Sequence, residues 1–386
     1  MLQRMRVPPQ RALLVLHPVF ALTGVVQAIG GPLLPSIAAR FHLADRQSGV
    51  LFLLYFAGTS LGAIVCRRDY VLSLRMSFLL MAVASLSISV APGPLLPVLF
   101  LLFGISNGVP MSAVNLYVGL NCGERCASIL TFLNFSWSVG ALVAPLLAAR
   151  VLLHHDYATA YRLLACAALI AFAACTFLDA SPSTLPISPA TPGSARARLL
   201  LLFAGAVFLQ VGVENTATTW MASFLLRATG ASAAEAAAAS SLYFMGFLAS
   251  RGLSSLVLLR TRGERMLGVV VLAALVSSLL LFVLPVPAAR GAAMLLLGAA
   301  LAPIYPIVIA MFFARTPQAA DTRWILATAG IGGSVLPWVA GWISSSTGSL
   351  RIGMLTIPAA LATMTLLLPM MSGPASGTRS TKTATA

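Results

Sequence analysis

The chain has 386 residues, of which 59% are hydrophobic and 9% are charged, and its formal net charge at pH 7 is +15. A soluble domain carries about 25% charged residues, so this composition excludes a water-soluble globule. Apolar runs recur that can cross a hydrocarbon core about 30 Å thick, and the short alternating segments of a membrane barrel are not seen. We therefore expect an all-α membrane protein, in which loop arginines set the topology and imply no nucleic-acid partner.

The apolar segments form two sets of six. The first set covers about residues 12–39, 47–66, 71–91, 94–120, 127–152 and 158–179. The second set covers about residues 199–227, 233–258, 266–285, 290–314, 323–346 and 351–371. Arginines precede the first segment as in a signal peptide, but it is longer than a signal core, so we expect it to be retained as a helix.

The polar intervals divide this pattern into domains. We predict an N-terminal six-helix bundle over residues 1–180 and a C-terminal six-helix bundle over residues 199–371. A Pro/Ser/Thr-rich cytoplasmic linker over residues 181–198 joins them, and a small, polar, disordered tail covers residues 372–386.

Short sequences repeat between the two halves. Residues 54–58 read LYFAG and residues 242–246 read LYFMG, while residues 24–27 (GVVQ) align with residues 212–215 (GVEN). A membrane protein built from two related halves is usually a transporter, with its substrate site where the halves meet. The repeats therefore predict a site between the two bundles.

The placement of basic residues predicts the orientation. An even number of spans with both termini in the cytoplasm puts most of the Lys and Arg residues on the inner side, as the positive-inside rule requires. We therefore expect a multi-pass protein of the inner or plasma membrane. The arginines left on the outer side are Arg40, Arg46, Arg150, Arg162, Arg227, Arg290 and Arg351.

Several motifs carry a resemblance to a known family. They are GPLLP at residues 31–35, NFSWSVG at residues 134–140 with Pro145, GVE at residues 212–214 with Trp220, the segment from Tyr243 to Arg251 and Gly252, and APIYP at residues 302–306. With two six-span halves, this pattern resembles the major facilitator superfamily over nearly the whole chain. More narrowly, it resembles the fucose–galactose–glucose proton symporter branch and its uncharacterised bacterial relatives. The resemblance implies twelve transmembrane helices in two pseudo-symmetric bundles that rock about a midplane site.

The same resemblance points to a charge latch at the cytoplasmic helix ends. The superfamily's loop signature survives in part near Gly62, and a second-half counterpart follows Gly252. Such charge pairs can break during rocking, although plain positive-inside signalling explains them equally well. The predicted latch residues are Arg67, Arg68, Asp69, Arg251, Glu264 and Arg265.

Glu214 is the one carboxylate predicted deep within a span. A charge at that depth costs at least about 2.5 kcal/mol unless it is paired, hydrated or protonated. Glu214 is therefore our candidate for proton coupling or for binding a polar solute, and the alternative is a glutamate that only ties helices together. The resembled symporters carry acidic groups in helices 1 and 4, where this chain has amides. Glu214 would thus carry protons almost alone, and facilitated diffusion or another coupling ion stays open.

Amide and aromatic side chains complete the predicted substrate site. They offer hydrogen bonds and ring faces of the kind that suit a sugar's hydroxyls and its apolar face. For any single amide, interhelical hydrogen bonding is an equally good explanation. The predicted substrate-binding residues are Gln27, Asn107, Asn115, Asn134, Trp137, Gln210, Glu214, Asn215, Tyr243 and Tyr305.

These features predict a secondary transporter of a small polar solute, with a sugar favoured and Glu214 as the proton-coupling residue. The alternatives are an exporter of amphipathic or cationic compounds and a non-transporting receptor or scaffold on the same fold. No nucleophile elbow, phosphate loop or metal-protease spacing is present in the sequence, so we expect no enzyme, cofactor or metal site. The expected partners are the solute, protons and the lipid bilayer, and the expected state is a monomer.

Overall fold

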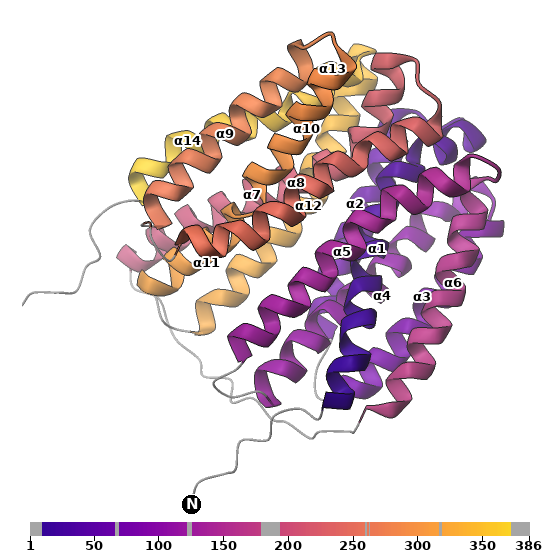
Figure 1. Cartoon of the computed structure of the whole chain (residues 1–386), viewed down its shortest axis with the longest axis horizontal. Helices are drawn as coiled ribbons and strands as arrows, with labels where there is room; N and C mark the ends of the chain where they lie inside the picture. Colours follow the sequence, from indigo (N-terminus) through magenta and orange to yellow (C-terminus); the bar gives the residue numbers. More distant parts are fainter. Residues whose placement is uncertain are drawn as a thin grey trace, which may run out of the picture.

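The computed structural model describes residues 10–65, 69–121, 126–178, 194–258, 261, 263–315 and 319–371. Within these ranges the chain is helical and contains no strand. Figure 1 shows the first half of the chain (indigo to magenta) as one bundle beside the second half (red to yellow).

The N-terminal bundle contains α1 (Gln10–Phe41), α2 (Asp45–Val65), α3 (Tyr70–Val90), α4 (Leu96–Asn121), α5 (Cys126–Leu152) and α6 (Tyr157–Ala174), with short 3-10 turns η1 (Gly93–Leu95) and η3 (Cys175–Phe177). The C-terminal bundle contains α7 (Ser194–Thr229), α8 (Ala233–Leu258), α9 (Gly263–Val283), α10 (Pro287–Leu301), α11 (Ile304–Arg315), α12 (Ala319–Thr347), α13 (Leu350–Met354) and α14 (Thr356–Met371). Within the described residues, ten segments have the length and apolarity of membrane spans. Helices α8 and α12 complete the two sets of six, and the predicted fold class is confirmed.

Two predicted spans are each built from a pair of helices. The segment at 290–314 breaks into α10 and α11 around Pro303, whose ring nitrogen has no hydrogen to continue the helical bonding. The segment at 351–371 breaks into α13 and α14 at Leu355. Helix α7 begins at Ser194, inside the segment predicted as a linker, because residues 194–198 (SARAR) are compatible with helix while the Pro and Gly that disfavour it lie before them.

Pseudo-symmetry between the halves is visible in the packing of glycines. A Cβ atom on Gly104 of α4 would collide with the carbonyl of Tyr55 in α2, and one on Gly298 of α10 would collide with the carbonyl of Tyr243 in α8. Both tyrosines belong to the repeated LYF sequence. Each half therefore uses a glycine to bring two helix backbones together at the matching place, as small residues do in membrane bundles.

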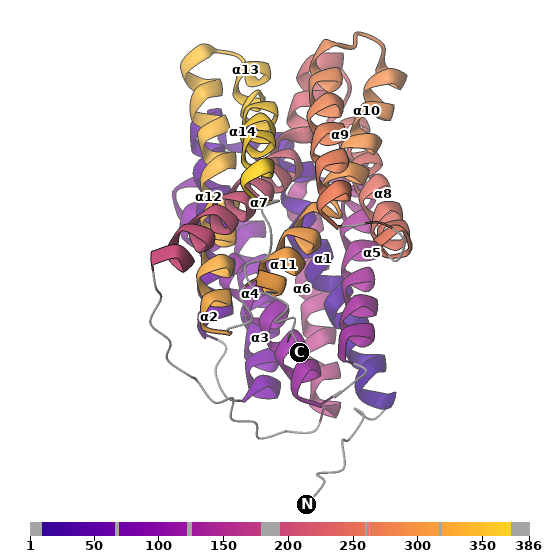
Figure 2. The ribbon, with the colours of Figure 1, turned by 90° about the vertical axis from the view of Figure 1, so that its left-hand side faces the viewer.

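Three helix pairs form most of the contact between the two bundles. Helix α1 contacts α7, α2 contacts α12, and α5 contacts α8. The second view again places α5 beside α8 and α2 beside α12 (Figure 2). At the α1–α7 contact the backbones approach closely, because a Cβ on Gly31 would meet the Thr218 carbonyl. These three contacts frame the central residues of α1 and α7, which carry the predicted site.

Candidate functional site

One hydrogen-bonded cluster lies in the N-terminal bundle. The Asn107 side-chain amide of α4 donates to Gln27 Oε1 of α1 at 3.0 Å and to the Tyr55 hydroxyl of α2 at 3.0 Å. The Tyr55 hydroxyl in turn lies 3.3 Å from Gln27 Oε1. Asn107 and Tyr55 are buried, while Gln27 is partly exposed. These hydrogen bonds join α1, α2 and α4 around Gln27, whose side chain remains partly accessible.

The second cluster surrounds Glu214 in the C-terminal bundle. Glu214 is partly exposed and interacts electrostatically with Arg251 of α8 and with the Gln210 amide one turn earlier on α7. Tyr243 of α8 and Tyr305 of α11 also lie within electrostatic range of the Glu214 carboxyl group. The Gln210 side chain is held in place by α10, because its Nε2 donates to the carbonyl of Leu301 at the end of that helix at 3.0 Å. Four predicted site residues therefore come together here.

The two clusters are related by the sequence repeat. The Tyr55 hydroxyl donates to the Val26 carbonyl at 3.3 Å, and the Tyr243 side chain lies within electrostatic range of Glu214. Val26 and Glu214 occupy matching positions in the GVVQ and GVEN sequences, as do the two tyrosines in theirs. The C-terminal half therefore places a carboxylate where the N-terminal half has a valine.

Arg251 connects the two bundles. Its Nη1 donates to Ser138 Oγ of α5 at 3.0 Å and contacts the Asn134 carbonyl at 3.4 Å. The guanidinium lies 5.3 Å from the Trp137 ring centroid and 4.7 Å from that of Phe247. Arg251 was predicted as a latch residue, and the structure places it against the predicted substrate-site residue Trp137 and within electrostatic range of Glu214.

Some residues of this centre were not predicted. Tyr55, Ser138, Thr218 and Phe247 lie among the predicted residues. The repeat could have revealed Tyr55, since it is the mate of Tyr243. The other three gave no signal, because serine, threonine and phenylalanine are ordinary residues in apolar helices.

Other predicted residues make their described contacts elsewhere. Asn115 donates to the Met111 carbonyl of its own helix at 2.6 Å, and buried Asn215 packs against Gly333 of α12. The Asn134 side chain is exposed. Asn115 and Asn215 are not joined to either cluster by a described side-chain contact, whereas the backbone carbonyl of Asn134 accepts from Arg251 Nη1.

The predicted charge latch is described only in part. Asp69 caps α3, because its side chain accepts from Leu72 N at 2.9 Å. Glu264 and Arg265 are exposed in the first turn of α9. Arg67 and Arg68 lie outside the described residues.

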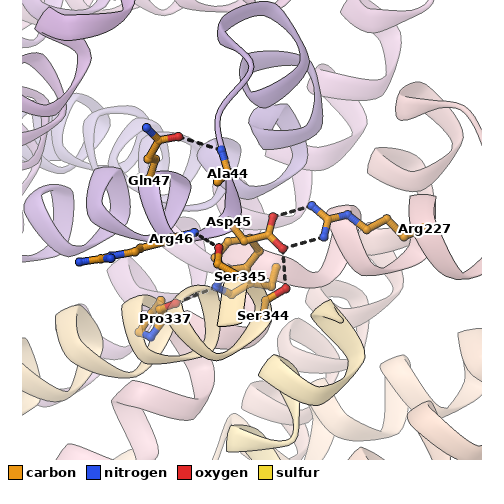
Figure 3. A network of polar contacts seen from close by, with 9 residues as sticks. Ala44, Asp45, Arg46, Gln47, Arg227, Pro337, Ser344 and Ser345 are labelled. Carbon is orange, nitrogen blue, oxygen red and sulfur yellow. Dashed lines mark hydrogen bonds and ion pairs between the residues drawn. The ribbon is translucent and has the colours of Figure 1, made fainter. Parts of the chain in front are cut away.

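An ion-pair network that we did not predict joins the bundles at one end (Figure 3). Arg227 at the end of α7 donates to both carboxylate oxygens of Asp45 at the start of α2 through its two terminal nitrogens Nη1 and Nη2, at 2.7 and 2.5 Å. Ser344 Oγ of α12 also donates to Asp45, and the Arg46 amide donates to Ser345 Oγ at 2.8 Å. We call these residues the Asp45 clamp. Sequence reasoning missed it because the partners lie in three different helices.

Breaking the Asp45 clamp should weaken contact between the bundles. We expect Asp45→Asn and Arg227→Gln each to lower the apparent Tm, with a coupling of about 0.5–1 kcal/mol, because the arginine is 47% exposed and solvent weakens the pair. A double-mutant cycle of thermal unfolding measures this coupling. Arg162→Gln, at an exposed arginine of α6, is the control. A purely additive cycle would show that the clamp does not hold the bundles together.

The helices, their two-bundle arrangement and the polar centre between them define a polytopic membrane transporter fold. The family model of the Major Facilitator Superfamily matches residues 16–323. The chain belongs to this superfamily. No curated protein sequence matches it.

Solved structures share the fold at low sequence identity. The D-xylose–proton symporter has a TM-score of 0.76 and 13% identity, over 95% of this chain and 99% of that one. The nucleoside transporter NupG has a TM-score of 0.75 and 13% identity, over 94% and 100%. The transporter FucP in its outward conformation has a TM-score of 0.65 and 17% identity, over 94% and 99%. At these identities the likeness concerns the fold alone.

Proposed function

We propose that the protein is a secondary active transporter that moves a small polar solute, preferably a sugar, by alternating access. The observation that carries the proposal is Arg251, which contacts Ser138 and Trp137 of one bundle and interacts with Glu214 of the other. Rocking of the bundles must change these contacts. A solute bound next to Arg251 would therefore contact residues of both bundles.

The charges of the centre favour a neutral solute. Glu214 and Arg251 bring one negative and one positive charge within electrostatic range of each other. A site for lipophilic cations would need a carboxylate without a nearby cation, so Arg251 argues against the export of cationic compounds. Hydroxyl groups, by contrast, can accept from the guanidinium and donate to the carboxylate.

Buried polar atoms with unused hydrogen-bonding capacity also favour a polar solute. Asn107 Oδ1, Trp137 Nε1 and Gln210 Oε1 are buried and have no hydrogen-bond partner among the described residues. Such groups normally have partners, and a bound solute or water would supply them. Gln27 and Glu214 are partly exposed, so the centre is not sealed as expected for a non-transporting receptor or scaffold.

Glu214 is the group that we assign to proton coupling. In its charged form it attracts Arg251, and in its protonated form it would release that attraction. Because Arg251 also holds Ser138, the protonation of Glu214 would alter the contact between the bundles. Proton binding could in this way change the balance between the two states of the carrier.

The names of the similar structures support this class of solute. D-xylose and nucleosides, named for two of them, both carry hydroxyl groups. We further propose the predicted orientation, with both termini in the cytoplasm of an inner or plasma-membrane protein. The Asp45 clamp then lies on the outer side.

A thermal-shift screen of the purified protein tests the solute. We expect one sugar to raise the apparent Tm, since ligand at 100 times its Kd adds about 2.7 kcal/mol. Gln27→Ala should weaken the affinity about fivefold by removing one hydrogen bond, and Asn134→Ala should weaken it as well. Gln47→Ala, at an amide that caps α2 far from the centre, is the control. Stabilisation by lipophilic cations alone would overturn the sugar proposal.

A further inference from the structure

A cavity lies at the end of the C-terminal bundle that carries Arg227, away from the central site. Its volume is about 340 Å³, and it is bounded by the ends of α7 and α9 and the starts of α10 and α13. Its walls include Arg227, Arg290 and Arg351, together with Phe224, Phe282 and Ser349. No carboxylate is among the described lining residues.

These three arginines are unexpected on this side of the protein. They belong to the small set that the predicted topology leaves outside, where arginines are disfavoured. They are far apart in sequence yet line one cavity, where like charges repel one another. Topology signalling does not account for such a cluster, and a cavity lined by cationic groups attracts anions.

The backbone holds two of the guanidinium groups in place. Arg290 donates to the Leu284 carbonyl at 2.6 Å and to the Ala228 carbonyl at 3.3 Å. Arg351 donates to the Phe282 carbonyl at 2.7 Å. A guanidinium has five N–H donors, so both retain unused donors. In the described part of the chain, neither of these arginines has a carboxylate partner.

We propose that this cavity binds a phosphate group. Arg290 and Arg351 offer charged N–H donors to the several acceptor oxygens of phosphate, which arginine binds in a forked geometry, and Arg227, already paired with Asp45, adds a third guanidinium group. The edge-to-face pair of Phe224 and Phe282, with ring centroids 5.4 Å apart, adds an apolar wall. The group can belong to an anionic phospholipid headgroup or to a free phosphate compound, and the site is separate from the proposed solute centre.

Arg227 links the phosphate site to the Asp45 clamp. The same guanidinium lines the cavity and binds Asp45. A phosphate in the cavity competes with the Asp45 carboxylate for it. Ligand binding therefore loosens the clamp, and removal of the carboxylate tightens ligand binding.

Thermal shift of the full-length protein tests the site. One arm titrates inorganic phosphate at constant ionic strength against chloride, and the other compares nanodiscs of phosphatidylglycerol with nanodiscs of phosphatidylcholine. We expect stabilisation in at least one arm. A response to phosphate identifies a free phosphate ligand, and a response to phosphatidylglycerol alone identifies a lipid headgroup.

Three variants separate the site from general charge effects. In the arm that responds, Arg290→Gln with Arg351→Gln should weaken the affinity about tenfold or more, by removing charged hydrogen bonds. Arg162→Gln should leave the affinity unchanged, and Asp45→Asn should increase it. The gain in Asp45→Asn keeps the test valid if the double variant folds poorly. No stabilisation in either arm, or equal affinity in the double variant and the wild type, would overturn the proposal.

Discussion

Glu214→Gln should abolish accumulation of the solute above its external concentration while leaving exchange of solute across the membrane intact. Glutamine keeps the size and hydrogen-bonding capacity of the side chain but cannot take up or release a proton in the physiological range. The neighbouring Gln210 and Arg251 can still support a polar solute. The measurement is uptake and counterflow in proteoliposomes with an imposed proton gradient.

The pH profile sharpens this test. Wild-type uptake should rise as the external medium is acidified, and uptake by Glu214→Gln should be flat. Glu235→Gln, at an exposed carboxylate that caps the start of α8, should behave like the wild type. If Glu214→Gln keeps both accumulation and exchange, the glutamate is structural and the coupling assignment is wrong.

The fold could be predicted from the sequence because its signal is spread over many residues. Each span needs only length and apolarity, and errors at single positions do not matter. The repeated LYF sequences predicted two related halves, and the matching contacts of Gly104 and Gly298 bear this out. The break at Pro303 was missed because prolines are common in continuous membrane helices as well, and the break at Leu355 was missed because leucine favours helix.

The candidate site could be predicted only in part. Glu214 is conspicuous, since a carboxylate within a span is rare and costly. The Asp45 clamp and the Arg251 contacts depend on which helices of the two bundles face each other, and a single sequence does not contain that information. The amides show the same limit. Asn107 and Asn115 are eight residues apart and so lie on the same face of α4. The Asn107 side chain nevertheless bonds to Gln27 of another helix, while the Asn115 side chain bonds to the backbone of its own helix.

Arg251→Gln should reduce transport by about tenfold or more and lower the stability by about 1–3 kcal/mol. The change removes the charged hydrogen bond to Ser138 and the stacking on Trp137 and Phe247. It also leaves Glu214 without its nearby cation, and an uncompensated charge in a low-dielectric region is destabilising. Uptake in proteoliposomes and the apparent Tm of the purified variant check both parts.

The double variant Glu214→Gln with Arg251→Gln separates the two causes. If the unpaired carboxylate matters, the double variant should be more stable than Arg251→Gln alone, since both charges are then gone. It should still transport poorly, because the contact with Ser138 remains lost. Arg251→Lys keeps the charge but not the forked, stacking geometry, so it should restore stability better than transport. An Arg251→Gln variant as active as the wild type would show that Arg251 does not link the solute centre to the movement of the bundles.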